Sequence, residues 1–257
     1  VADAKALYET IRGKDPLDAT SIDDDTYPKK EVEEKLRIGV PVHLLTEGVD
    51  ADVRAHFDAT LDALTAAGHE VTEVSLPTSA SALPVYYVIM PAEASTNLAR
   101  FDGIRYGHAA RGKDLLQDYI QARTEGFGAE TKRRILLGTF VLSSGYIDAY
   151  YRKADAARLV LTNEYNAAFA DVDVIAFPTT PSPAFKFGEK SDPVSMYIED
   201  IFTVTANLTG MPAISVPMGT VVREGSTLPT GIHFTAPHGA DDLLFKIGAA
   251  VTGETLY

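Results

Sequence analysis

The chain has 257 residues, 46% of them hydrophobic and 23% charged, a composition that excludes a largely disordered protein and allows a substantial core. Its net charge of -13 argues against a broad nucleic-acid surface, which needs clustered lysine and arginine side chains. The absence of cysteine excludes disulfides and thiolate metal sites and fits a reducing, intracellular compartment.

The first third of the chain alternates between helical and extended patterns. Residues 1–13 have the apolar spacing of a helix, and residues 21–35 are a charged connector. Residues 35–45 and 69–77 are typical of strands, and the segment between them, residues 50–68, is typical of an amphipathic helix. This order predicts a βαβ-like unit whose strands are parallel.

Helical patterns dominate the middle of the chain, and strands return towards its end. The expected helices are residues 83–101, broken or kinked at Pro91, and residues 113–128, 130–165, 195–210 and 240–254. The expected strands are residues 171–185, which run into a proline-rich loop, and residues 212–219 and 230–237. The pattern predicts an α/β fold. No apolar run reaches the ~18 residues of a membrane span, so we expect a cytoplasmic protein without membrane contact.

The usual catalytic motifs are absent from the sequence. It contains no G-x-S-x-G elbow, no phosphate-binding glycine loop and no pair of histidines four residues apart, so no metal site is expected. Ser143 and Ser144 are interpreted as small residues that bond to the backbone and allow close packing, rather than as nucleophiles.

Arg134 stands out in the long helical segment. A helix would place it on the same face as Gly138 and Gly145, whereas the adjacent Arg133 would face elsewhere. Each glycine costs a helix about 1 kcal/mol relative to alanine, so their presence suggests that something approaches this face closely. Packing of another helix is one explanation, and a ligand is the other.

Asp200 is the second unusual charge. In a continuous helix over residues 195–210 its carboxylate would lie on the apolar stripe, with Met196 and Val204. A buried carboxylate needs a partner, either an internal arginine or a ligand. If Asp200 faces a ligand ammonium and Arg134 a ligand carboxylate, the two would together select a free α-amino acid.

Several stretches resemble a known family. They are "YYVIMPAEASTNLARFDGIRYG" (86–107), "KRRILLGTFVLSSGYIDAYY" (132–151), "FPTTPSPAFKFGE" (177–189) and "NLTGMPAISVP" (207–217). They are similar to the A subunits of glutamyl-tRNA(Gln) amidotransferases, a branch of the amidase signature family. The resemblance covers residues 1–257 and implies part of a single amidase signature domain, a layered α/β/α fold around a mixed sheet.

The resemblance also implies an activity and partners. The A subunits of this branch hydrolyse glutamine, and the ammonia passes to a B subunit, which uses ATP and magnesium to convert Glu-tRNA(Gln) to Gln-tRNA(Gln). A small C subunit joins the complex. By motif position, Arg134 corresponds to the arginine that holds the substrate carboxylate and Asp200 to the aspartate that holds the ammonium. Tyr86 corresponds to a tyrosine that lines the same pocket. No cofactor is implied for this chain itself.

One departure from the family affects the mechanism. The family's lysine, bridging serine and nucleophilic serine belong to a signature of the form G-G-S-S-G-G-S, which does not occur in these 257 residues. In the family it precedes the region matched here, so we expect the C-terminal portion of the protein, with no catalytic residue and no activity alone. Two alternatives stay open: part of another amidase signature hydrolase, and a non-catalytic interaction module.

Overall fold

The computed structural model describes residues 1–30, 33–190 and 192–256, and the chain divides into two compact units. The sheet unit comprises Val1–Leu83 and Val160–Tyr257, and the helical unit comprises Pro84–Leu159. Residues 31 and 32 of the predicted connector lie outside the described residues. Across the described part of the chain, no helix combines the length and the apolar character needed to cross a membrane.

The sheet unit contains a five-stranded mixed sheet in the order β2-β1-β3-β5-β4. Strand β1 (Arg37–Val40) is parallel to β2 (Glu70–Glu73) and to β3 (Val174–Pro178), and Ile38 pairs with Val174. Strand β5 (Ser226–Thr235) is antiparallel to both β3 and β4 (Ala213–Arg223). The structure confirms the α/β class, the mixed sheet and the parallel βαβ-like unit.

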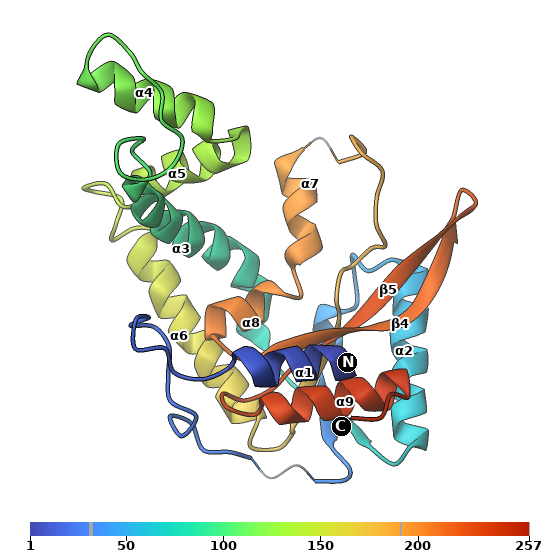
Figure 1. Ribbon diagram of the computed structural model, residues 1–257. Coiled ribbons are helices and arrows are strands. Elements are labelled where there is room, and N and C mark those ends of the chain that lie inside the picture. The colour runs from blue at the N-terminus through green and yellow to red at the C-terminus, as the bar shows by residue number, and fades with distance from the viewer. Residues whose placement is uncertain (31–32, 191, 257) are drawn as a thin grey trace. The chain divides into compact units, whose positions relative to one another are not determined.

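Three helices of this unit follow the predicted patterns. Helix α2 (Ala51–Ala66) starts where the Asp50 side chain accepts a hydrogen bond from the backbone N–H of Asp52, a regular N-cap. Helix α9 (Asp241–Thr252) packs against β4, and α1 (Ala2–Ile11) lies beside α9 (Figure 1). The ring centroids of Tyr8 and Phe245 lie 5.4 Å apart and join α1 to α9.

The core of the sheet unit consists of apolar side chains that lie on the inward-facing sides of the strands and helices. All five residues of β3 are buried, as expected for a central strand covered on both faces. The largest fully buried side chains include Phe57 of α2, Phe177 of β3, Phe234 of β5 and Ile247 of α9. Removal of this apolar surface from water is the main stabilising term for the sheet unit.

The helical unit contains α4 (Leu115–Gly126), α5 (Ala129–Val141) and most of α3 (Ala82–Asn97); α6 (Tyr151–Ala168) contributes residues to both units. Helix α3 continues through Pro91, so the chain does not break there, and the kink that was the other predicted outcome stays a prediction. A proline ring fixes a φ that suits a helix, and the cost of the lost hydrogen bond is offset by the surrounding packing.

The long helix predicted over residues 130–165 is in fact two helices. Residues 142–150, between α5 and α6, form turns, and Gly145 has a φ of 89°, in the left-handed region that favours glycine. The residues "SSGY" therefore mark a change of direction, because glycine permits a backbone conformation that ends the helical ladder.

The helix predicted over residues 195–210 is also interrupted. Its residues form α7 (Pro193–Tyr197), the 3-10 turn η4 (Ile198–Asp200) and α8 (Val204–Thr209). Asp192 caps α7 by accepting hydrogen bonds from two backbone N–H groups. The other 3-10 turns are η1 (Val42–Leu44), η2 (Pro77–Ser81) and η3 (Leu98–Arg100).

Asp173, just before β3, joins the connector to the sheet. Its Oδ1 lies 2.7 Å from Lys30 Nζ and 2.9 Å from Arg37 Nη2, and its Oδ2 accepts a hydrogen bond from the backbone N–H of Arg37 at 2.8 Å. Burial alone would raise the pKa of Asp173, but the hydrogen bonds from Arg37 and Lys30 outweigh it and lower the pKa to about 2.

This carboxylate makes the stability of the chain sensitive to acid. A lowered folded-state pKa stabilises the fold fully above the ordinary value near 3.8 and loses that effect as the pH falls towards 2. We expect Asp173→Asn to lower the free energy of unfolding at pH 7 by about 2 kcal/mol and to flatten its dependence on pH between 4 and 2. Urea unfolding at several pH values measures this. Exposed Asp171→Asn is the control, and an equal loss in both variants would contradict the assignment.

Candidate functional site

Arg134 lies on α5 and is held in one orientation by its neighbours. Its Nε donates to Glu130 Oε1 at 2.8 Å, one helical turn earlier, and its Nη1 lies 3.5 Å from the sulfur of Met90 on α3. The guanidinium carbon is 5.6 Å from the ring centroid of Tyr87. A cation above an aromatic face, fixed on a second side by a carboxylate, is oriented before any ligand arrives.

The structure distinguishes Arg134 from Arg133. The side chain of Arg134 is 27% exposed, whereas that of Arg133 is 53% exposed, although both form ion pairs with Glu130. Burial alone would lower the pKa of Arg134, but hydrogen bonds to Glu130 and Tyr86 more than compensate and raise it. Arg134 is therefore a permanent, half-buried cation on the face of α5 that also carries Gly138.

Tyr86 belongs to the same cluster. It lies on α3 next to Tyr87, and the two rings meet edge to face with centroids 5.0 Å apart. The structure thus brings together Tyr86 and Arg134, two of the three predicted substrate-binding residues, within the helical unit. A cation and two phenol rings form a polar, aromatic setting that suits a planar carboxylate.

Gly138, one turn after Arg134, accounts for the close approach that the sequence indicated. A Cβ on this residue would lie 1.9 Å from the carbonyl oxygen of Pro91 and 2.8 Å from Cβ of Ser95. Helix α3 therefore packs directly on the backbone of α5 at this point. Close helix packing explains Gly138, and it brings Met90 and Tyr87 within reach of Arg134.

Asp200 belongs to the sheet unit and is exposed, which corrects the prediction of a carboxylate on a buried apolar stripe. The stripe assumed a continuous helix, and the chain instead forms the turn η4 at residues 198–200. The Asp200 backbone carbonyl accepts hydrogen bonds from the backbone N–H and the side-chain hydroxyl of Thr203, at 3.0 and 3.1 Å. Its pairing with Arg134 across a ligand stays a prediction.

Ser143 and Ser144 lie in the exposed turns after α5, not within a helix. Ser143 Oγ donates to the backbone carbonyl of Phe140 at 2.7 Å. Its hydroxyl therefore bonds locally, as expected, although the close packing that we also predicted there is absent from this exposed segment.

Glu199, the neighbour of Asp200, contacts Ser182 and Lys190, and the sequence analysis did not predict these contacts. Its Oε2 accepts a hydrogen bond from Ser182 Oγ at 2.8 Å, and its Oε1 binds the Lys190 ammonium. The side chains of Glu199 and Lys190 are only 13% and 21% exposed. Both partners come from the proline-rich loop (residues 179–190), which has no period from which such a contact could be predicted.

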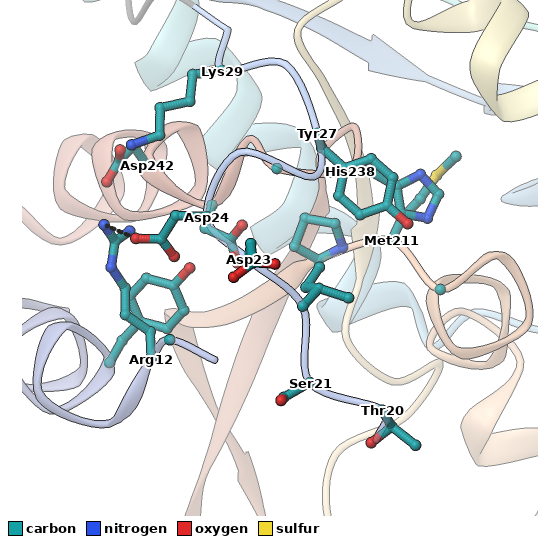
Figure 2. Close-up of a pocket in the computed structure, with 17 residues that line it drawn as sticks. Arg12, Thr20, Ser21, Asp23, Asp24, Tyr27, Lys29, Met211, His238 and Asp242 are labelled. Carbon is teal, nitrogen blue, oxygen red and sulfur yellow. Dashed lines mark hydrogen bonds and ion pairs between the residues drawn. The ribbon is translucent and has the colours of Figure 1, made fainter. Parts of the chain in front are cut away.

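A cavity of about 390 Å³ lies elsewhere in the sheet unit (Figure 2). Part of the predicted charged connector forms one wall: the ring of Tyr27 stacks on His238 with centroids 4.9 Å apart, and Arg12 Nη2 donates to Asp24 at 3.4 Å. Asp242 at the start of α9 lines it too. None of the three predicted substrate-binding residues lines this cavity.

Comparison with known proteins identifies relatives of the chain. It is 48% identical over 258 residues to the A subunit of glutamyl-tRNA(Gln) amidotransferase from Koribacter versatilis and 50% identical over 260 residues to its counterpart from Acidobacterium capsulatum. Each alignment covers 98% of this chain and 53% of the relative, so the chain spans about half the length of these curated relatives.

A solved structure gives the same result. The crystal structure of the glutamyl-tRNA(Gln) amidotransferase A subunit from Thermotoga maritima matches with a TM-score of 0.73 and 34% identity, over 100% of this chain and 51% of that one. The allophanate hydrolase of Kluyveromyces lactis matches with a TM-score of 0.72 but only 17% identity, and so supports the fold alone. The family model described as amidase matches residues 1–245. The chain therefore belongs to the amidase family.

Proposed function

We propose that the chain is the substrate-selecting part of a glutaminase subunit in a tRNA-dependent amidotransferase. The observation that carries this proposal is the 48–50% identity to the A subunits of glutamyl-tRNA(Gln) amidotransferases over 98% of the chain. The oriented guanidinium of Arg134 supports it, because a fixed cation suits the carboxylate of a free amino acid.

In this proposal the residues of the chain bind and orient glutamine. Arg134 binds the α-carboxylate, Tyr86 lines the pocket beside it, and Asp200 accepts hydrogen bonds from the α-ammonium. A zwitterion held at both charges has its side-chain amide in a fixed position, which is the positioning that hydrolysis of that amide to glutamate and ammonia requires. The nucleophile and its base belong to the signature segment that these 257 residues do not contain.

The same proposal assigns partners and a compartment. The ammonia would pass to a B subunit, which uses ATP and magnesium to convert Glu-tRNA(Gln) to Gln-tRNA(Gln), with a C subunit completing the complex in the cytoplasm. The net charge of -13 fits this arrangement, because tRNA would be held by the partner rather than by this acidic chain.

The chain by itself is expected to release no ammonia from glutamine. Substrate contacts without a nucleophile cannot form an acyl-enzyme intermediate. A coupled glutamate dehydrogenase assay on the purified chain measures this, with the full-length protein in complex with its partners as the positive control. Ammonia release by the chain above the buffer rate would contradict the absence of a catalytic residue. Failure of the full-length complex to hydrolyse glutamine would contradict the proposed function itself.

A further inference from the structure

We infer that Glu199 is a positioning residue for substrate binding, whose carboxylate fastens the proline-rich loop to the turn that carries Asp200. The inference rests on the proposed role of Asp200 in holding the ammonium of glutamine. It concerns residues of the sheet unit only, and Glu199, Ser182 and Lys190 are not among the predicted substrate-binding residues.

The Glu199 side chain connects turn η4 to the proline-rich loop (residues 179–190), which precedes it in the sequence. Its two oxygens are bound by different residues of the loop: Oε2 by the Ser182 hydroxyl and Oε1 by the Lys190 ammonium. Lys190 also lies over the ring of Phe185, 4.7 Å from its centroid. A carboxylate held at both oxygens in a partly buried setting has little freedom to rotate, so the backbone at residue 199 is fixed as well.

The loop itself is anchored to the sheet, so it can serve as a rigid support. The backbone N–H of Thr179 donates to the Gly231 carbonyl on β5 at 2.7 Å, and Thr179 Oγ1 lies 2.6 Å from Ser215 Oγ on β4. The Pro181 carbonyl accepts a hydrogen bond from the backbone N–H of Asp50 at 2.8 Å. Glu199 is therefore held by a loop that is itself hydrogen-bonded to strands β4 and β5.

The turn that carries Asp200 needs such support. Turn η4 has three residues, and it is followed by residues 201–203 before α8 begins. A short 3-10 turn has weak hydrogen bonds of its own. Because Asp200 directly follows Glu199, fastening residue 199 fixes the backbone from which the Asp200 carboxylate extends, and a displacement of about 1 Å is enough to weaken ligand binding.

The same loop offers a matched control. Lys186 pairs with Glu224 at the tip of the β4–β5 hairpin, but these side chains are 67% and 73% exposed. An exposed pair of this kind contributes little. Lys186→Met and Lys190→Met thus remove the same charge from the same loop, one at an exposed pair and one at the partly buried contact with Glu199.

Hydrogen exchange on the chain tests the structural part of the inference. We expect Glu199→Gln and Lys190→Met to accelerate exchange of the amides at residues 198–203 by about 5-fold or more, with Lys186→Met unchanged. Unchanged exchange in both Glu199→Gln and Lys190→Met, or equal acceleration in Lys186→Met, would overturn it.

Kinetics on the full-length protein in its complex test the functional part. We expect Glu199→Gln and Lys190→Met to raise KM for glutamine by about 5- to 10-fold while kcat stays within about 2-fold, with no change for a small uncharged amide. Glutamine kinetics equal to wild type, or equal losses on both amides, would overturn the positioning role. A wild-type complex without glutaminase activity would refute the proposed function instead, and hydrogen exchange would then decide whether Glu199 holds the turn.

Discussion

Replacing Arg134 by alanine in the full-length protein is expected to lower kcat/KM for glutamine by roughly 30-fold or more. The substitution would leave the substrate carboxylate without its cation in a partly dry pocket, a loss on the order of 2 to 5 kcal/mol. Asp200→Ala is expected to lower kcat/KM for glutamine by a similar factor, because it removes the carboxylate that would bind the substrate ammonium. Hydrolysis of a small uncharged amide should be much less affected, because it carries neither charge.

Controls separate binding from folding in this experiment. Arg133→Ala removes a neighbouring cation whose side chain is 53% exposed, and it should be mild. Arg134→Lys keeps the charge but not the planar fork and is expected to lie between wild type and Arg134→Ala. Thermal unfolding shows whether each variant stays folded. If Arg133→Ala is the more damaging change, or if both amides suffer equally, Arg134 supports the fold and does not bind the substrate.

Gly138→Ala is expected to destabilise the chain by about 3 kcal/mol or more, although alanine normally stabilises a helix relative to glycine by about 1 kcal/mol. The reversed sign follows from the new Cβ, which would lie 1.9 Å from the Pro91 carbonyl oxygen. A backbone atom in α3 cannot move aside like the end of a flexible side chain, so the helices must separate.

Chemical denaturation followed by circular dichroism measures the effect, and hydrogen exchange in α3 and α5 localises it. Gly128→Ser is the matched control: Gly128 is the N-cap of the same helix, a Cβ there meets nothing within 4 Å, and serine is a favoured cap. A neutral or stabilising Gly138→Ala would show that the contact between α3 and α5 is looser than the structure has it.

Regular elements were predicted well where one hydrophobic period runs without interruption. Helix α2 matches its predicted position because Asp50 marks the helix start. Strands β1 and β2 lie within their predicted segments but are shorter, because residues 42–44 form the 3-10 turn η1 and η2 begins at Pro77. The hairpin was underestimated: β4 and β5 continue beyond the predicted strands to a turn at Glu224 and Gly225, both with positive φ. Glu-Gly is a weaker turn signal than Asn-Gly or Asp-Gly.

The helical interruptions show why periodicity alone fails. The spacing of apolar residues continues through 142–150 and 198–203, but the chain leaves the α-helical conformation in both segments. Gly145, with its positive φ, lies in the first, and the 3-10 turn η4 lies in the second. For the site, helical geometry correctly chose Arg134 over Arg133 as the more buried cation, because both lie in the unbroken part of α5. The same reasoning misplaced Asp200, because its helix is not continuous. The Glu199 contact depends on tertiary pairing and leaves no periodic signal.

The connection between β1 and β3 bears on the order in which the molecule folds. Ile38 pairs with Val174, and the whole helical unit lies between these residues in the chain. Pairing β1 with β3 closes a loop that contains the whole helical unit, and the entropy cost of closing it comes before the sheet contacts form. Helices α3, α4 and α5 instead depend on contacts between residues that are close in sequence. We therefore expect the helical unit to form early during synthesis, while β1 and β2 wait for β3, with their apolar faces open to chaperones until the ribosome has released the second half of the sheet.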